Sequence, residues 1–484
     1  MTKNNTPSSV RVRFAPSPTG HLHIGSLRTA IFNWLFARHH KGSFLLRIED
    51  TDRERSKQEY LDSLLESLRW MSLESDEPLV IQTSRMKEHK EVVEQLIREG
   101  KAYRCFCSID EVQALKEELM AEGKLLKYNG VCRDKNPSAE DLKKPYVVRF
   151  KLPYDKGPIV WDDYIRDTVT FNADQLEDFI IVRSDGTPMY NFVVVVDDAA
   201  MKITHVIRGE DHISNTPKQI LLYQACGYTL PRFAHIPLIL GPSGDRLSKR
   251  DGAVAALDYR GQGYLPDALF NYLVRLGWAH GDQEIFSRDE LVSFFTLEAV
   301  GKKGSIFDPV KLAWMNGIYL RDASNDAILN QILLYVEPHL IENLKNFSSD
   351  QILSLIALYK ERAKTLKDIV SELLHLHTPA YTFDEKEIHQ LGDAATLKKN
   401  LEQLIDCLSN ISVFTTDNVS QAIKQLSHDL GIKLPMLAQP IRLALTGTLK
   451  SPGVFDLLAV LKKEESIRRL TSFLQFIEAM QPHI

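Results

Sequence analysis

The sequence predicts an α/β domain that is interrupted by an α+β insertion and followed by an all-helical region. Segments of strand, helix and strand character alternate in residues 10–48, whereas helical periodicity recurs in residues 326–484. Glycine divides the chain in the same way, because 20 of the 24 glycines precede residue 326 and 4 follow it. The two parts are therefore expected to be built differently.

The α/β domain is expected to begin with a parallel pair of strands. Val12 and Phe14 alternate with Arg11 and Arg13, which is the period of a strand. A proline- and glycine-rich loop, APSPTG, then occupies residues 15–20. The next expected elements are a helix over residues 26–40 and a strand over residues 44–48. Strand, helix and strand in this order are typical of a parallel sheet.

A later apolar run and the segment before it indicate an interruption of this sheet. Tyr190–Asp198 (YNFVVVVDD) would be apolar on both faces of an extended chain, which predicts a buried central strand. Residues 90–185 combine mixed strands, a lysine-rich helix and three of the five cysteines. We therefore expect an inserted domain there.

The C-terminal region carries helix start and stop signals. Ser348–Gln351 (SSDQ) is a capping-box pattern that precedes apolar residues at helical spacing. The periodicity returns over residues 397–408 and 419–430, with Asn418 as the expected N-cap and Gly431 as the expected C-terminal stop. Two small helical subdomains are expected.

Composition and charge exclude several classes of protein. The chain is long enough for about three domains, and its 44% hydrophobic and 25% charged residues are typical of a folded globular protein. The net charge of −5 gives no indication of a nucleic-acid partner. Five cysteines, a polar N-terminus and the lack of a long apolar stretch argue against a disulfide scaffold, a signal peptide and a membrane span. A cytoplasmic location is expected.

The segment Pro18–Ser26 (PTGHLHIGS) joins the first strand to the first helix. A helix N-terminus offers free N–H groups and a partial positive charge, and glycine lets a ligand approach the backbone, so the segment suits a phosphate. His21 and His23 could donate hydrogen bonds to it. The alternative is an ordinary strand-to-helix turn.

A second segment, Gly241–Arg250 (GPSGDRLSKR), combines a glycine-rich loop with cationic and hydroxyl side chains. Such a loop can close on a polyphosphate and place positive charge where negative charge develops. A solvated basic turn is the commoner meaning of the pattern. The sequence contains no Gly-x-x-x-x-Gly-Lys-Ser/Thr motif, which excludes a P-loop nucleotide site.

Together the two segments resemble the signature motifs of bacterial glutamyl-tRNA synthetases, which are class I aminoacyl-tRNA synthetases. His23–Ser26 (HIGS) is similar to the HIGH motif and Arg246–Arg250 (RLSKR) to the KMSKS motif. The resemblance is dense over residues 11–55 and 178–287, which include RFAPSPTGHLHIGSLRTAIFNWLFARHHKGSFLLRIEDTDRERS, YNFVVVVDD and THVIRGEDHISNT. It implies a Rossmann-like catalytic domain split by the insertion and followed by a helical anticodon-binding region.

The resemblance also implies domain boundaries. The expected domains are a first half of the catalytic domain at 1–90, an acceptor-stem-binding insertion at 91–188, a second catalytic half at 189–255, a helical stem-contact domain at 256–325 and the anticodon-binding region at 326–484.

The implied activity is ATP-dependent activation of L-glutamate to glutamyl-adenylate, with Mg²⁺ accompanying ATP, and transfer to the terminal adenosine of tRNA(Glu). His23 would hold the triphosphate, and Lys249 would stabilise the charge on the departing pyrophosphate. The implied ATP-binding residues are His21, His23, Gly25, Ser26, Arg246, Leu247, Ser248, Lys249 and Arg250. Ser26 and Arg246 depart from the HIGH and KMSKS patterns but keep a donor and a charge.

For glutamate, the resemblance implies a pocket with cations for the carboxylates and an anion for the ammonium group. Arg13 and Arg208 match positions that bind the amino acid, and a guanidinium suits a carboxylate because it can bind both oxygens. Glu49 would take the ammonium group. The implied glutamate-binding residues are Arg13, Ala15, Ser17, Glu49, Tyr190 and Arg208.

The insertion contains Cys105, Cys107 and, after 24 further residues, Cys132. Some members of the family bind a structural zinc ion with this spacing. Three thiolates need a fourth ligand to complete a tetrahedron, for which Asp134 and Tyr128 are the candidates. The alternative is three reduced cysteines in an insertion that folds without metal.

Other functions compete with this interpretation. A non-discriminating member would also charge tRNA(Gln), and the sequence does not decide between the two ranges. Glutamyl-queuosine synthetases lack the long helical region, glutaminyl-tRNA synthetases carry a β-barrel there, and a non-catalytic paralogue would be expected to lose His23 or Lys249. A monomer without membrane association is expected.

Overall fold

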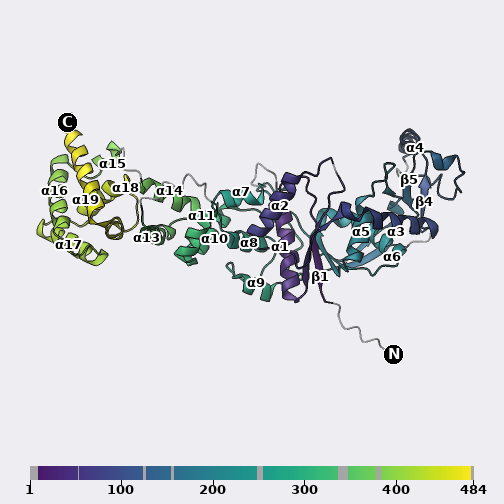
Figure 1. Cartoon of the computed structure of the whole chain (residues 1–484), viewed down its shortest axis with the longest axis horizontal. Helices are drawn as coiled ribbons and strands as arrows, with labels where there is room; N and C mark the ends of the chain where they lie inside the picture. The colour runs from purple at the N-terminus through teal and green to yellow at the C-terminus, as the bar shows by residue number, and fades with distance from the viewer. Residues whose placement is uncertain are drawn as a thin grey trace, which may run out of the picture. The chain divides into compact units, whose positions relative to one another are not determined.

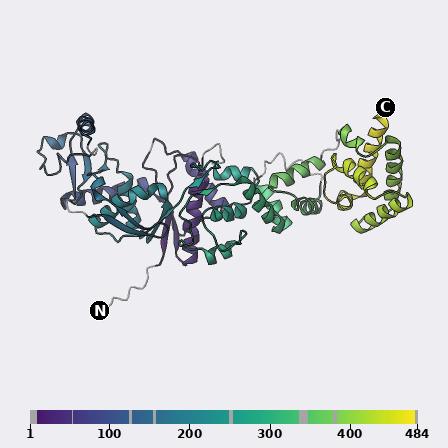
Figure 2. The same cartoon turned by 180° about the vertical axis from the view of Figure 1, so that it is seen from behind.

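The computed structural model describes residues 9–52, 54–123, 127–153, 157–247, 254–335, 347–377 and 383–480. The chain divides into two compact units. The first unit extends to Asp258 and includes Leu269–Pro309; the second consists of Tyr259–Ala268 and the chain from Val310 onward. Figures 1 and 2 show from opposite sides that the first unit contains sheets and that the described part of the second is helical.

The N-terminal sheet is parallel, as predicted. Strands β1 (Arg11–Phe14), β2 (Ser43–Ile48) and β3 (Val80–Ile81) pair in this order, and α1 (Ile24–His39) connects the first two. The helix begins two residues before the predicted start, because His23 already caps it.

A second sheet continues beside β1. Its strand order is β7 (Asp167–Phe171), β6 (Ile159–Asp163), β10 (Arg232–Ile236) and β9 (His205–Gly209), and all neighbours are parallel except β6 and β7. The backbone N–H of Thr204, directly before β9, donates to the carbonyl of Arg11 at the start of β1. The two strands therefore start side by side, and a crevice for ligands is expected beyond their carboxyl ends.

The insertion has the α+β composition that the sequence predicts. Strands β4 (Ala102–Cys105), β5 (Val147–Phe150) and β8 (Ile180–Val182) form an antiparallel sheet, and α4 (Ile109–Ala121) begins at a capping box between Ser108 and Glu111. Strands β6 and β7 also fall within residues 91–188, but they extend the sheet of β9 and β10.

The predicted central strand at Tyr190–Asp198 is wrong, because this segment is helix α5 (Tyr190–Ala200). Its residues Phe192–Asp198 are all buried, so the helix is covered on every side over these residues, and the consecutive apolar residues hide its period. A short apolar run cannot distinguish a buried strand from a buried helix, and its valines favour the strand. The difference matters for the site, because it determines how far apart Tyr190 and Asp198 lie. Eight residues rise about 12 Å in a helix and about 26 Å in a strand.

Further elements complete the first unit around these sheets. They are α2 (Gln58–Trp70), α3 (Met86–Arg98), α6 (Thr216–Cys226), β11 (Ile239–Leu240), α9 (Arg288–Phe294) and β12 (Ser305–Ile306). Helices α7 (Ala256–Gly261) and α8 (Pro266–Arg275) contain the division between the units.

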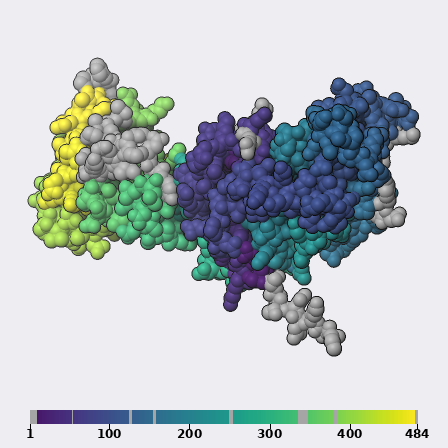
Figure 3. All heavy atoms as spheres, turned by 45° about the vertical axis from the view of Figure 1, so that its right-hand side comes forward, coloured from purple at the N-terminus to yellow at the C-terminus, as the bar shows by residue number. Residues whose placement is uncertain are grey.

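The second unit is helical over its described residues. Its helices are α10 (Pro309–Asp322), α11 (Asn325–Tyr335), α13 (Ser349–Lys360), α14 (Leu366–His377), α15 (Glu385–His389), α16 (Ala394–Ser409), α17 (Thr416–Asp429), α18 (Pro435–Thr446) and α19 (Val454–Met480). Leucine-rich faces of these helices share one core, and the space-filling view shows α19 (yellow) beside α16 and α17 (Figure 3).

The helix signals of this unit are confirmed in all but one case. The capping box at Ser348–Gln351 is formed, and Gly431 follows the end of α17 with a positive φ of 62°. Asn418 is not the N-cap of α17. Thr415 is, because its hydroxyl accepts the backbone N–H of Asn418 three residues later. None of the described helices has the length and apolarity of a membrane span.

Candidate active site

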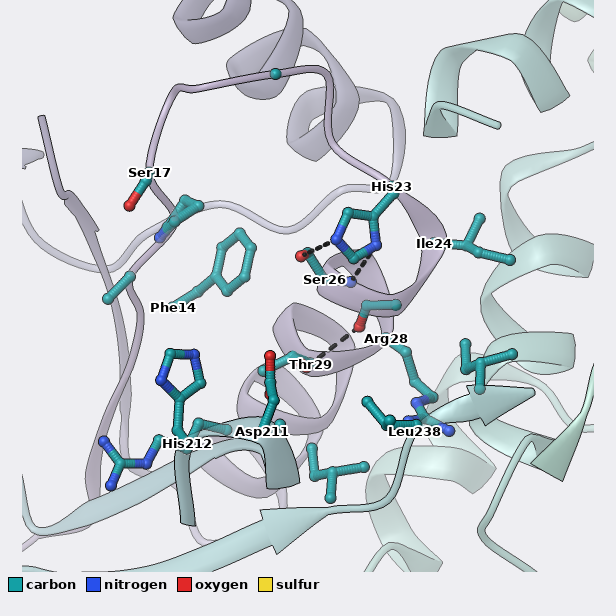
Figure 4. A pocket seen from close by; sticks show the side chains of 18 of the residues that line it. Phe14, Ser17, His23, Ile24, Ser26, Arg28, Thr29, Asp211, His212 and Leu238 are labelled. Carbon is teal, nitrogen blue, oxygen red and sulfur yellow. Dashed lines mark hydrogen bonds between the residues drawn. The ribbon is translucent and has the colours of Figure 1, made fainter. Parts of the chain in front are cut away.

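A cavity of about 990 Å³ lies beyond the carboxyl ends of β1, β9 and β10. The structure brings twelve of the predicted site residues to its lining: Arg13, Ala15, Ser17, His21, His23, Gly25, Ser26, Glu49, Tyr190, Arg208, Arg246 and Leu247. In Figure 4, His23 and Ser26 lie across the cavity from Asp211 and His212. Residues predicted separately from two distant motifs therefore share one site.

His23 begins helix α1 and lies over its first turn. Its Nδ1 accepts the backbone N–H of Ser26 at 3.3 Å, and its Nε2 is 3.1 Å from the Ser26 hydroxyl (Figure 4). The accepting Nδ1 places the ring proton on Nε2. Gly25 permits this arrangement, because a Cβ there would lie only 3.1 Å from Cε1 and Nδ1 of the ring.

The electrostatics at this end of the cavity keep His23 neutral. Burial lowers the pKa of His23, and the nearby Arg246 guanidinium lowers it further, against a smaller opposing effect of Asp211. A neutral imidazole can donate from one nitrogen only. The free backbone N–H groups and the dipole of α1 supply the positive potential that an anion needs.

His21 lines the cavity, but its side chain already has contacts with α2. Its Nδ1 is 3.1 Å from the hydroxyl of Ser63, and its ring meets the edge of Tyr60 at 5.1 Å between centroids. These contacts hold His21 at the rim. They leave Nε2 as its available donor.

The segment that resembles the KMSKS motif leaves the sheet as a hairpin. The backbone N–H of Leu247 donates to the carbonyl of Ile239 at 3.1 Å, and Gly244 takes the positive φ of 85° that the turn requires. After the segment, Ala256 donates its N–H to the carbonyl of Leu22 at 2.8 Å. Both described ends therefore lie at the cavity. Ser248, Lys249 and Arg250 lie outside the described residues.

One wall of the cavity is a buried ionic network. Arg13 donates through Nε to both carboxylate oxygens of Asp198 at 3.1 and 3.2 Å. Arg47 bridges Asp198 at 2.5 Å and Glu49 at 2.9 Å. Two cations and two anions thus balance, and within the described residues the terminal nitrogens of Arg13 have no hydrogen-bond partner.

The two carboxyl groups of this network are shifted in opposite directions. Burial raises the pKa of Glu49, and Arg47 only partly offsets that effect. Burial also acts on Asp198, but the Arg13 and Arg47 guanidinium groups outweigh it and hold the pKa of Asp198 below its usual value. Asp198 is therefore ionised without a ligand. A ligand cation beside Glu49 would favour the ionised form of that carboxyl group.

A second part of the cavity wall carries Arg208, which lies on β9 beside β1 and whose hydrogen-bond partners are neutral. Its Nη1 donates to Gln219 and its Nη2 to Thr216, both at 2.8 Å, and its Nε lies 3.2 Å from Nε2 of His235. Burial lowers the pKa of Arg208. A buried cation with no carboxylate partner among the described residues indicates a binding place for an anion.

Tyr190 and His212 also line the cavity. The Tyr190 hydroxyl is 3.2 Å from Nδ1 of His212. Burial, with Glu49 nearby, raises the pKa of Tyr190 to about 12. Burial and the Arg208 charge lower the pKa of His212 to about 4. Both side chains are therefore neutral hydrogen-bonding groups at neutral pH.

The three cysteines of the insertion come together in the structure. The Sγ atoms of Cys105, Cys107 and Cys132 lie within 4.8 Å of one another. The Tyr128 hydroxyl is 3.2 Å from Cys105 Sγ and 3.5 Å from Cys107 Sγ. Three thiolate sulfurs are ligands that zinc prefers, and the Tyr128 oxygen lies where a fourth ligand would be needed.

Asp134, the first candidate for the fourth ligand, does not join this cluster. Its carboxylate is exposed and forms an ion pair with Lys151 at 2.8 Å. The cluster of possible metal ligands among the described residues contains the three thiols but not this carboxylate. Tyr128, the alternative candidate, is the one that lies at the thiols.

Several residues of the site were not predicted from the sequence. Asp198 and Arg47 hold Arg13 and Glu49, and Gln219, Thr216 and His235 surround Arg208. One signal was available, because two adjacent carboxylates that end an apolar run must find partners if the run is buried. The partners of Arg208 left no comparable signal, since they are neutral and lie on separate elements.

Comparisons with known proteins agree with this geometry. A family model described as tRNA synthetases class I (E and Q), catalytic domain, matches residues 9–314, and one described as an anticodon binding domain matches residues 331–474. The glutamate–tRNA ligase of Thermodesulfovibrio yellowstonii is 45% identical over 95% of this chain and 98% of its own length. That of Geobacter sulfurreducens is 44% identical over 97% of this chain and 100% of its own length.

Solved structures agree as well. A glutamate tRNA ligase from Elizabethkingia meningosepticum, in complex with its amino acid, superposes with a TM-score of 0.86 at 35% identity and covers 97% of this chain and 100% of its own. The fold, the shared cavity and the two matched models define a class I tRNA synthetase of the E and Q group. Within that class, the chain belongs to the glutamate–tRNA ligases, which are enzymes that form aminoacyl-tRNA.

Proposed function

We propose that the cavity activates L-glutamate with ATP and passes the glutamyl group to the terminal adenosine of tRNA(Glu). The observation that carries the proposal is that one cavity joins a cationic wall to the N-terminus of α1. The first feature suits a dicarboxylic amino acid and the second a polyphosphate. The two reactants would therefore meet in a single space.

The amino acid would be held by charge complementarity. Arg208 and the terminal nitrogens of Arg13 would bind its carboxylates, and Glu49 would accept its ammonium group. Ala15 and Ser17 line the cavity in the loop after β1, and Tyr190 faces it from α5. Glutamine would be disfavoured at a guanidinium that awaits a negative charge, because its amide leaves that charge unpaired.

ATP would lie over the first turn of α1. His23 would donate from Nε2 to a phosphate oxygen, together with Gly25 and Ser26, and Arg246 and Leu247 would close the opposite side. Lys249, with Ser248 and Arg250, would supply charge where pyrophosphate departs. Mg²⁺ bound with ATP would neutralise phosphate charge.

The chemistry needs no covalent enzyme intermediate. A glutamate carboxylate oxygen attacks the α-phosphorus of ATP, and the bond to pyrophosphate breaks. The terminal ribose hydroxyl of tRNA then attacks the adenylate carbonyl, and AMP leaves. Orientation of reactants can lower a barrier by roughly 7–11 kcal/mol, which is the contribution that a rigid cavity makes.

The experiment is aminoacylation with labelled glutamate, ATP and Mg²⁺, run separately with pure tRNA(Glu) and tRNA(Gln) transcripts. Charging of tRNA(Glu) is the expected result. Charging of both transcripts would extend the function to a non-discriminating enzyme. Charging of neither, with the protein folded, would contradict the proposal and favour the queuosine or non-catalytic alternative.

For the insertion we propose a structural zinc ion held by Cys105, Cys107, Cys132 and Tyr128. The spacing supports it, since the three thiol sulfurs lie within 4.8 Å of one another and the Tyr128 hydroxyl is 3.2 Å from Cys105 Sγ and 3.5 Å from Cys107 Sγ. Metal analysis of the purified protein should give about one equivalent of zinc. A metal-free protein that folds normally would contradict the site, and Asp134→Ala should leave the zinc content unchanged.

A further inference from the structure

The Arg208 guanidinium contacts the ring of His235, and that ring in turn contacts the carboxylate of Asp163. The register of β9 and β10 pairs Arg208 directly with His235. The register of β10 and β6 places Asp163 beside Phe233, two residues before His235. Three adjacent strands therefore bring a carboxylate, an imidazole and a guanidinium into one row.

The Asp163 carboxylate is fixed by the backbone. Its Oδ1 accepts the N–H groups of Ile165 and Arg166 at 3.0 Å and that of His235 at 3.2 Å. Its Oδ2 lies 2.5 Å from Nδ1 of His235. Burial opposes ionisation, but these hydrogen bonds and His235 hold the pKa of Asp163 below its usual value. The carboxylate is therefore an ionised acceptor.

An ionised Asp163 determines which ring nitrogen of His235 carries the proton. Nδ1 must donate to Oδ2, and Nε2 is left as an acceptor. That acceptor faces the Nε–H of Arg208 at 3.2 Å and the Thr216 hydroxyl at 3.1 Å. The opposite tautomer would set an N–H of His235 against the N–H of Arg208.

We propose that Asp163 and His235 form a positioning relay that holds Arg208 in the orientation that binds a carboxylate of glutamate. This inference rests on the proposed function for the identity of the ligand. Asp163 and His235 do not line the cavity, whereas Arg208 does. They act through Arg208 and set the affinity for the amino acid.

Asp163→Asn tests the relay because it changes one atom. The amide oxygen stays with the three backbone donors, so the amide nitrogen takes the place of Oδ2 and donates to Nδ1. The proton of His235 then moves to Nε2 and faces Arg208. Aminoacylation kinetics should show a rise in KM for glutamate of about tenfold or more, with kcat within about threefold and KM for ATP unchanged.

His235→Gln provides the rescue. The glutamine amide oxygen can take the place of Nε2 as the acceptor for Arg208, and its orientation no longer depends on Asp163. The double variant Asp163→Asn with His235→Gln should therefore have a lower KM for glutamate than Asp163→Asn alone. A double variant at least as impaired as Asp163→Asn would overturn the relay.

Asp197→Asn is the matched control. Asp197 also accepts from a buried histidine, His89, at 2.8 Å, and at the same distance from Arg85 and Gln82; neither Asp197 nor His89 lines the cavity. The control should lose thermal stability as Asp163→Asn does, with KM for glutamate unchanged. Equal changes in KM for both variants would reduce Asp163 to a structural role and overturn the proposal.

A spectroscopic measurement covers the case in which Asp163→Asn does not fold. ¹⁵N shifts of histidine-labelled wild-type protein, with His235 assigned by its loss in His235→Gln, should show a neutral ring protonated at Nδ1. A ring protonated at Nε2, or at both nitrogens, would overturn the relay. This result does not depend on activity, so it separates the relay from the proposed function, which fails if wild-type protein charges no tRNA.

Discussion

Two arginines of the cavity are equally buried but differ in their hydrogen-bond partners. Arg13 and Arg208 are 4% and 5% exposed. Arg13 shares the Asp198 carboxylate with Arg47, whereas Arg208 has a histidine, a glutamine and a threonine around it. One wall is therefore an ionic network of two cations and two anions, and the other holds a cation that has no carboxylate hydrogen-bonded to it among the described residues.

The difference indicates that one arginine serves mainly the stability of the fold and the other mainly the binding of a ligand. Breaking a buried ion pair costs stability, because the remaining charge has no partner. Arg208 is already a buried charge without a carboxylate partner among the described residues, and an anionic ligand would supply that partner. The Arg13 wall should therefore contribute mainly to stability and the Arg208 wall mainly to affinity.

Substitution of Arg208 should give the largest effect on activity and should test this division directly. Arg208→Gln removes a cation that awaits a carboxylate, and truncating one member of a buried charge pair costs about 2–5 kcal/mol in binding. The kcat/KM for glutamate should fall by about a thousandfold, which corresponds to about 4 kcal/mol. Aminoacylation kinetics measure this loss.

The stability of the same variant is the control. Removal of a buried cation without a carboxylate partner should leave the melting temperature within a few degrees of the wild type. A strong loss of stability with little change in KM would break the comparison, because Arg208 would then be part of the scaffold.

Asp198→Asn should show the opposite pattern. It leaves Arg13 and Arg47 buried with a neutral acceptor, and breaking such a pair costs about 3–5 kcal/mol. Urea denaturation should show a loss of this size. If the unfolding free energy changes by less than that of Arg208→Gln, the Arg13 wall does not have the role assigned to it.

Sequence patterns predicted the parallel sheet and the helices of the second unit, and together with the resemblance they predicted twelve of the residues that line the cavity. The strand period at Val12 and Phe14 and the turn residues before α1 are local signals, and the resemblance supplied the rest of the site. The error at Tyr190–Ala200 has a physical origin, since a fully buried helix has no polar face to reveal its period. Only the tertiary environment distinguishes the two states there.

The partners of the predicted residues were harder to foresee. Asp134 and Tyr128 were both candidates beside the cysteines, and the structure turns Asp134 toward Lys151 instead. Asp163 and His235 are 72 residues apart and meet only because β6 and β10 are neighbours. The acidic net charge likewise gave no sign of tRNA, because a chain-wide sum does not report where charges lie.

A substitution of Lys249 tests the phosphate end of the proposed site, as the substitutions above test the two walls that are proposed to bind glutamate. Lys249→Ala should lower adenylate formation by about tenfold or more, since it removes a contact made to charge that develops in the transition state. Affinity for tRNA should be nearly unchanged. Gel-shift binding and single-turnover adenylate formation measure the two quantities, and equal losses in both would contradict a transition-state role.

The smallest effect is the acid dependence of the Arg13 wall. The pKa of Asp198 in the folded protein is lower than in the unfolded chain, so its ionised form stabilises the fold. This contribution is complete above the unfolded pKa of about 3.9 and is lost as pH falls toward the folded pKa. The stability difference between wild type and Asp198→Asn should be constant from about pH 7 to 5 and about 0.3 kcal/mol smaller at about pH 4. Urea denaturation at these pH values measures it, and a difference that grows on acidification would mean that Arg13 and Arg47 do not hold Asp198 ionised.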